Sequence, residues 1–205
     1  MTASRDTLSQ AIIDAGRFLY SRGWSPATSS NYSARLTSSE ALLTVSGKHK
    51  GELTPADLLA VDMQGQSLEE GKKPSAETLL HTQLYRWNPD IGAVLHTHSV
   101  NATVLSRMTA GDSLVFVDYE LQKAFAGVSS HEGEVRVPIF DNDQDIARLA
   151  GKVQPWLAAH PDCVGYLIRG HGLYTWGPAM SDALRQVEAF EFLFECELKV
   201  RALQR

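Results

Sequence analysis

Apolar residues recur along the chain at two different spacings, which predict an alternation of helices and strands. The first helical pattern covers residues 8–19, follows a capping-box sequence at 7–10 and stops before Gly23. Further helices are expected at 54–59, 74–87, 99–108, 142–159 and 181–205. Strands are expected at 32–36, 42–45, 60–63, 91–98, 114–117, 135–139, 163–168 and 173–176. This alternation predicts an α/β fold in which helices cover a mixed sheet.

No Pro/Gly/Ser-rich linker or block of charge divides the chain. We therefore expect a single domain of residues 1–205, a length that can bury one core. Residues 163–168 form a continuous apolar run, which is typical of a buried central strand. In the last helix, Phe190 and Leu193 widen the apolar face, which predicts a contact with a partner subunit.

Charge and composition exclude several classes of partner. The net charge of −5 is modest and the Lys and Arg residues are scattered, so we expect neither a nucleic-acid nor a membrane-surface partner. We see no apolar run long enough to span a membrane, and residues 1–10 lack the apolar stretch of a signal peptide. Cys163 and Cys196 form no Cys-x-x-Cys pair, which favours reduced thiols in a cytoplasmic protein.

Two histidines follow the apolar run that begins at Ile91. Side chains two apart in a strand point to the same face, so His96 and His98 are expected side by side at a strand end. That arrangement suits two ligands of one divalent metal. The alternative is a pair of polar residues at a strand end, solvated or hydrogen-bonded.

A third histidine, His171, lies between two glycines at the end of the most apolar strand. Flanking glycines would let the main chain approach a ligand closely. With His96 and His98 it would complete a three-histidine site with an open fourth position, the form of a catalytic zinc site. The alternative is a glycine-rich turn that carries a histidine by chance.

Two further residues stand at helical spacing. Glu77 is expected in the first turn of its helix, where the helix dipole favours a carboxylate, so a plain helix-start role is the simpler interpretation. His81 follows four residues later and is interpreted as a solvated or core-edge side chain rather than a ligand. The remaining histidines, His49, His131 and His160, are expected at the surface.

Three short loops, at 29–31, 46–48 and 74–76, have the same polar character. Each offers hydroxyls, amides or free main-chain N–H groups beside a strand end or a helix start. Such groups bind phosphate well. Each loop taken alone is better explained as an ordinary turn or helix cap.

The ordered set of Asn31, Ser46-Gly47, 74–77, 96–98 and 170–172 resembles the class II aldolase/adducin family over nearly the whole chain. The resemblance implies a three-layer αβα fold with a central mixed β-sheet. It also implies a homotetramer with its sites near subunit interfaces, acting on a small sugar phosphate. The residue roles that the resemblance implies are zinc ligands, one ion per subunit, at His96, His98 and His171; an acid/base at Glu77; and substrate-phosphate contacts at Asn31, Ser46, Gly47 and Ser75. The aldolases usually have a second serine where this chain has Ala76, which removes one phosphate hydroxyl.

Within this family, the stretches 46–51 and 119–123 resemble a sugar-phosphate dehydratase, in which a glutamate at the position of Glu120 is the acid/base. Because Glu120 follows the apolar strand 114–117, we expect partial desolvation and a raised carboxyl pKa. Some dehydratases have a cysteine at the position of Thr78, and this chain lacks it. A class II sugar-phosphate aldolase is the alternative function. A non-catalytic adducin-like module is third, because it would leave the three histidines without a purpose.

Overall fold

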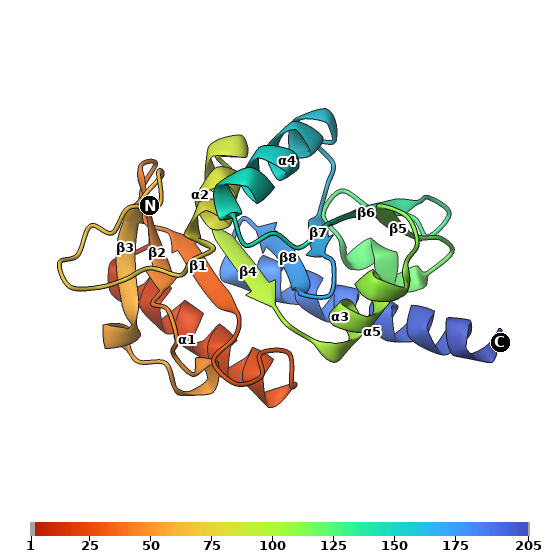
Figure 1. Cartoon of the computed structure of the whole chain (residues 1–205), viewed down its shortest axis with the longest axis horizontal. Helices are drawn as coiled ribbons and strands as arrows, with labels where there is room; N and C mark the ends of the chain where they lie inside the picture. The colour runs from red at the N-terminus through yellow and green to blue at the C-terminus, as the bar shows by residue number, and fades with distance from the viewer. Residues whose placement is uncertain (1–2, 205) are drawn as a thin grey trace.

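A computed structural model of the chain describes residues 3–204 and contains one eight-stranded sheet (Figure 1). The strands are β1 Asn31–Arg35, β2 Glu40–Thr44, β3 Leu58–Asp62, β4 Ala93–Thr97, β5 Ser113–Phe116, β6 Val135–Phe140, β7 Gly165–Ile168 and β8 Gly172–Gly177. The α-helices are α1 Arg5–Ser21, α2 Thr78–Trp87, α3 Val100–Met108, α4 Ile146–Ala159 and α5 Met180–Leu203. Three short 3-10 helices are η1 Lys50–Glu52, η2 Pro55–Asp57 and η3 Glu120–Ala124.

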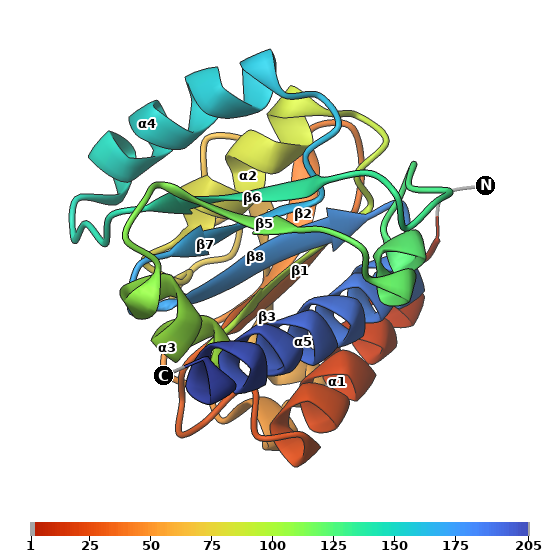
Figure 2. The ribbon, with the colours of Figure 1, turned by 90° about the vertical axis from the view of Figure 1, so that its right-hand side faces the viewer.

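The strand order is β3-β2-β1-β4-β8-β7-β6-β5. Only the β6–β7 pair is parallel among these neighbours, so the sheet is mixed, as predicted. Figure 2 shows α2 and α4 on one face and α1 and α5 on the other. The α/β class and the three αβα layers are therefore confirmed. Among the described residues, no helix is both long and apolar enough to cross a membrane.

Strand β4 lies at the centre of the sheet, between β1 and β8. All five of its residues are buried, because helices cover both faces of the sheet. This explains the uninterrupted apolar run that leads into His96. A side chain at the end of this strand is consequently held by packing on every side.

Several predicted boundaries are wrong for reasons that lie in tertiary structure. The expected helix at 54–59 is only the 3-10 turn Pro55–Asp57, because Leu58 already pairs with Thr44 in the sheet. The expected helix at 74–87 begins at Thr78, after a turn at 76–77. The helix expected at 142–159 begins at Ile146, where Asp145 caps it through the main-chain N–H of Arg148. The last helix ends at Leu203, and Arg205 lies outside the described residues.

The expected partner face of α5 is also corrected. Phe190 and Leu193 are both fully buried in the chain's own core, against β-strand residues such as Phe116 and Leu167. The large apolar residues that this helix exposes are instead Phe192, Val200 and Leu203. Both cysteines are free thiols, as predicted.

Candidate metal centre

The side chains of Glu77, His96, His98 and His171 converge on one point, although they come from three separate parts of the chain. The Nε2 atoms of the three histidines are 2.7, 3.1 and 3.3 Å apart. The Glu77 carboxylate completes the cluster, with Oε2 at 3.3 Å from His96 Nε2 and Oε1 at 3.4 Å from His171 Nε2. The structure thus brings together the three predicted ligands and one of the two predicted acids.

His96 is held in one orientation by the neighbouring strand. Its Nδ1–H donates to the main-chain oxygen of Leu173 at 2.9 Å, and its ring stacks on Tyr174 with centroids 4.1 Å apart. Because Nδ1 carries the hydrogen, the Nε2 lone pair faces the cluster. Fixing the second ring nitrogen in this way is how proteins prepare a histidine to bind a metal.

The two glycines beside His171 have distinct roles. Gly170 has a φ of +66°, a conformation that favours glycine, and it forms the turn that connects β7 to β8. A Cβ atom at Gly172 would lie 2.0 Å from the main-chain oxygen of Thr97, so only glycine allows β8 to approach β4 here. The close approach is therefore to a neighbouring strand and not, as the sequence suggested, to a ligand. His171 Nδ1 lies 3.3 Å from Asn142 Oδ1, an acceptor that leaves Nε2 for the cluster.

Burial keeps two histidines of the cluster, His96 and His98, in the neutral form. Burial lowers the pKa of His98 to about 2 and places the pKa of His96 well below its usual value. One possible ligand atom from each of the four residues lies within 4.8 Å of those of the other three. Neutral imidazole and ionised carboxylate are the forms in which these groups bind a metal.

The geometry fits a single divalent ion. Ligand nitrogens about 2.0–2.1 Å from a tetrahedral zinc lie about 3.3 Å apart, close to two of the three separations in the cluster. The third separation, 2.7 Å between His96 and His98, would open slightly on binding. The Glu/His3 cluster could therefore bind a metal, with the three histidines as ligands and Glu77 beside them.

Glu77 is the N-cap residue of α2 rather than a residue of its first turn. Its Oε2 accepts a hydrogen bond of 2.8 Å from the amide nitrogen of Asn31. Its main-chain N–H donates to Ser75 Oγ at 3.3 Å, so the turn before the helix contributes to its placement. Glu77 is thereby held with both carboxylate oxygens toward the histidines.

The expectation that His81 is solvated or at the core edge is wrong. It is fully buried, and its two ring nitrogens contact Ser33 and Asn31. The helical spacing from Glu77 was a signal for this position, but only the packing of α2 on β1 determines what His81 contacts. Of the other three histidines, His131 is exposed, whereas His49 and His160 are half-buried.

Two of the three loops expected to bind phosphate, at 46–48 and 74–76, are joined by main-chain pairing. An isolated bridge pairs Val45 with Pro74, which brings Ser46 and Gly47 beside the loop that holds Ser75. Ser46 and Gly47 are exposed, and Gly47 has a φ of +74°. The Asn31 side chain differs, because it is buried and its amide contacts Glu77 and His81. The predicted phosphate roles of these residues stay predictions.

Lys50 is a buried cation among these loops, with 1% of its surface exposed. Its Nζ donates to the main-chain oxygens of Thr28 and Lys48 at 3.3 and 2.7 Å. Burial lowers the pKa of Lys50 to about 8, and no carboxylate of the described residues pairs with it. Lys48, by contrast, pairs with Asp57 at 2.9 Å. Sequence alone did not separate these two lysines.

Glu120 lies outside the cluster, and the expected desolvation is wrong. It begins η3, its side chain is 73% exposed, and it pairs with Lys123 and with His131. The contact with Lys123 lowers the pKa of this carboxyl instead of raising it. The strand ends at Phe116, so Glu120 follows a three-residue connection and is not covered by the sheet.

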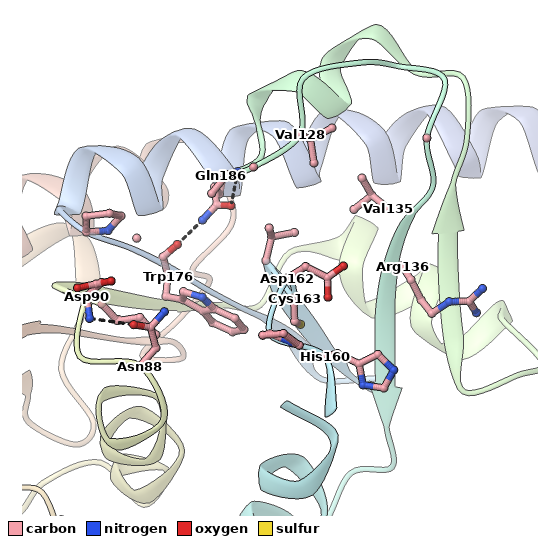
Figure 3. A pocket seen from close by; sticks show the side chains of 18 of the residues that line it. Asn88, Asp90, Val128, Val135, Arg136, His160, Asp162, Cys163, Trp176 and Gln186 are labelled. Carbon is pink, nitrogen blue, oxygen red and sulfur yellow. Dashed lines mark hydrogen bonds between the residues drawn. The ribbon is translucent and has the colours of Figure 1, made fainter. Parts of the chain in front are cut away.

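Two cavities open elsewhere and contain none of the four cluster residues. One of about 820 Å3 lies at the opposite end of β4 and β8, where Trp176, His160 and Asp162 line it (Figure 3). A second, of about 960 Å3, lies between α1 and the loops that follow α2 and β8. The chemistry of the cluster is therefore separate from both.

The mixed sheet between helices, with three histidines and a glutamate at the end of its central strand, defines a structural class of protein. Residues 10–198 match the profile of the Class II Aldolase and Adducin N-terminal domain, and the chain belongs to this family. The resemblance predicted from the sequence is thus confirmed.

Comparison with full-length relatives shows which members of this family the chain is similar to. The chain is 78% identical over 203 residues to the methylthioribulose-1-phosphate dehydratase of Pseudomonas fluorescens, covering 99% of this chain and 98% of that protein. It is 77% identical over 204 residues to the same enzyme of Azotobacter vinelandii, covering 100% and 99%. Among solved structures, L-fuculose-1-phosphate aldolase from Thermus thermophilus is similar with a TM-score of 0.78 and 28% identity, covering 98% of each chain.

Proposed function

We propose that this protein is a hydro-lyase that dehydrates 5-methylthioribulose 1-phosphate to 5-methylthio-2,3-dioxopentyl phosphate. The convergence of Glu77, His96, His98 and His171 carries the proposal, together with 78% identity to a named dehydratase over the full chain. This reaction belongs to methionine salvage, a pathway of amino-acid biosynthesis, and we propose that the protein carries it out in the cytoplasm. We propose zinc as the metal, one ion per subunit, because three neutral imidazoles with one open position are typical of catalytic zinc.

In this reaction a proton leaves C3, the C4 hydroxyl departs as water, and the enol that forms becomes a 2,3-diketone. A bound zinc would supply Lewis-acid stabilisation of the negative charge that develops on the substrate oxygens. Glu77 lies at the cluster as a carboxylate with both oxygens toward the histidines, so it is placed to accept the C3 proton. Because Glu77 acts as the base in this scheme, a separate residue is proposed as the acid that protonates the departing hydroxyl.

We assign that acid to Glu120, which in a lone chain is exposed and outside the cluster. It could act only at the site of a neighbouring subunit, in the homotetramer that the family resemblance predicts. Assembly would also desolvate this carboxyl and thereby raise its pKa, as a group that donates a proton near neutral pH requires. The exposed Leu121 beside it is compatible with such a contact.

The substrate phosphate is proposed to bind at the joined loops, with contacts from Ser46, Gly47 and Ser75. Lys50 supplies the positive charge, because it is buried without a carboxylate and lies between the loops. Binding the phosphate at a distance from the reacting carbons holds those carbons at the cluster. Asn31 contributes through its main chain only, since its side chain contacts Glu77.

The alternative is cleavage of a carbon–carbon bond, because L-fuculose-1-phosphate aldolase has a similar fold at 28% identity. Product analysis on methylthioribulose 1-phosphate separates the two. Dehydration gives one diketone phosphate and one water, whereas cleavage gives two carbonyl fragments. Two carbonyl fragments, or no turnover by protein that carries about one zinc per chain, would overturn the proposed function.

A further inference from the structure

Four buried side chains behind Glu77 form one continuous hydrogen-bonded chain. Tyr85 Oη lies 2.7 Å from Ser33 Oγ, and Ser33 Oγ lies 2.8 Å from His81 Nδ1. His81 Nε2 contacts Asn31 Oδ1, and Asn31 Nδ2 donates to Glu77 Oε2 at 2.8 Å. All four side chains are 5% exposed or less, so water does not complete any of these contacts.

The carboxylate sets the direction of every bond in this chain. The amide of Asn31 turns its NH2 group toward Glu77, where Nδ2 donates to Oε2, and its oxygen toward His81. The amide oxygen only accepts, so His81 must carry its hydrogen on Nε2. A neutral ring then leaves Nδ1 as an acceptor for the Ser33 hydroxyl. With its hydrogen used there, Ser33 Oγ accepts from the Tyr85 hydroxyl.

The opposite tautomer is incompatible with the same packing. A hydrogen on His81 Nδ1 would leave Nε2 as an acceptor and would turn the amide of Asn31 around. The amide oxygen would then face Glu77 Oε2 at 2.8 Å, which brings two acceptors together. The His81 ring also meets the edge of Tyr174 at 5.5 Å between centroids, which restricts rotation of the imidazole.

We propose that His81 is a positioning residue that, through Asn31, fixes the Glu77 carboxylate beside the metal ligands. The Nε2–H tautomer of His81 presents the Asn31 amide as a donor to Oε2. This contact keeps Oε2 near His96 and Oε1 near His171. The inference deepens the proposed function, on which it rests for the role of Glu77, and it assigns His81 no contact with substrate. The contacts from Ser33 through His81 and Asn31 to Glu77 are all paired, and a buried polar network that is fully paired favours one geometry.

The tautomer can be measured directly on the wild-type protein. Nitrogen-15 NMR of labelled His81 is expected to show a hydrogen on Nε2 and none on Nδ1, with and without zinc. A hydrogen on Nδ1 would overturn the proposal. Because this readout needs neither substrate nor turnover, it stays valid if the proposed function fails.

A set of variants tests the action through Asn31. His81→Phe removes the donor and is expected to lower zinc affinity or turnover number about 10- to 100-fold, with a small change in KM. His81→Gln, which can still donate to Asn31 Oδ1, is expected to recover most of the loss. Tyr85→Phe is the matched control, because it removes only the far end of the chain. Zinc affinity is measured by competition with a chromophoric chelator, so a preparation without activity still gives a result.

A double-mutant cycle separates positioning from packing. In an Asn31→Ala background, His81→Phe is expected to cost less than about 2-fold more, because the two residues act as one unit. Independent, additive losses would overturn the proposal, as would a Gln variant no better than Phe. Should His81→Phe fail to fold, His81→Gln and the NMR measurement still decide.

Discussion

Gly172 lies so close to Thr97 that a Cβ atom would stand 2.0 Å from the Thr97 carbonyl oxygen. Gly172→Ala is therefore expected to push β8 away from β4, with a loss of about 1–3 kcal/mol of stability and of bound metal. The control is Gly151→Ala in α4, where nothing lies within 4 Å of the new Cβ. That change is expected to be neutral or stabilising by about 0.4–1 kcal/mol. Urea unfolding measures the stability of the two variants, and metal analysis measures their bound metal. Equal results for the two variants would contradict the prediction.

Metal removal is expected to lower the stability of the wild-type protein. An ion that binds only the folded state stabilises it by about 4 kcal/mol at a free concentration one thousand times its dissociation constant. Chelation should therefore lower the melting temperature, and added zinc should restore it. His96→Ala should show the lower value in both conditions, because one of three ligands is absent. A variant that still responds fully to zinc would argue against this ligand assignment.

Phosphate binding is expected to weaken as the pH rises past about 8, where Lys50 loses its proton. Lys50→Met should remove this dependence and raise the KM of the phosphorylated substrate below about pH 8, where wild-type Lys50 is charged. Lys48→Met is the control, since Lys48 is exposed and paired with Asp57.

The folding stability of the substrate-free protein should change in the opposite direction, because the Lys50 charge is unfavourable when no phosphate is bound. The folded-state pKa of Lys50 lies below 10.5, so charged Lys50 costs stability below about pH 8, and Lys50→Met should be more stable there.

Glu191 makes the stability of the protein depend on pH in the acid range. It is 2% exposed, Asn101 donates to it at 3.3 Å, and burial raises its pKa from 4.5 to about 7. The folded state thus keeps a proton that the unfolded chain releases between pH 4.5 and 7, so stability falls as the pH rises through that window.

Glu191→Gln is expected to remove this decline and to stabilise the protein at pH 8 by up to about 3 kcal/mol, at 1.36 kcal/mol per pKa unit. Denaturant unfolding at pH 5 and pH 8 measures the effect. Glu195→Gln, at an exposed position paired with Lys199, is the control. A wild-type stability that does not change between the two pH values would refute the role of Glu191.

Isosteric changes in zinc-loaded protein test the proposed base, Glu77, and the proposed acid, Glu120. Glu77→Gln and Glu120→Gln should each lower the turnover number about 10²–10⁴-fold, with little change in KM. Because Glu120 is proposed to serve a neighbouring site, mixing inactive Glu77→Gln and Glu120→Gln subunits should restore part of the activity. Near-normal turnover of Glu120→Gln would remove this residue from the reaction. No recovery in assembled mixed oligomers would place both groups in the same chain.

The features that sequence predicted are those that local patterns determine. Strand alternation was enough to place His96 and His98 on one face, and the apolar run around Leu167 identified a buried strand. The burial of His81 and of Lys50 depends on which elements pack over them, and no local pattern carries that information. The predicted desolvation of Glu120 was wrong for a related reason. An apolar strand precedes this residue, but the turn between them leads the chain out to the surface.

The strand order also has a consequence for biosynthesis. His96 and His98 are made more than seventy residues before His171, and β4 pairs with β8 only once Gly177 has been synthesised. A ribosome-bound chain that ends before His171 therefore lacks both the third imidazole and the carbonyl of Leu173 that orients His96. Contacts between such distant segments form late and slowly. Metal capture should consequently be a late event, following release of most of the chain, and premature truncation should yield a polypeptide with no affinity for the ion.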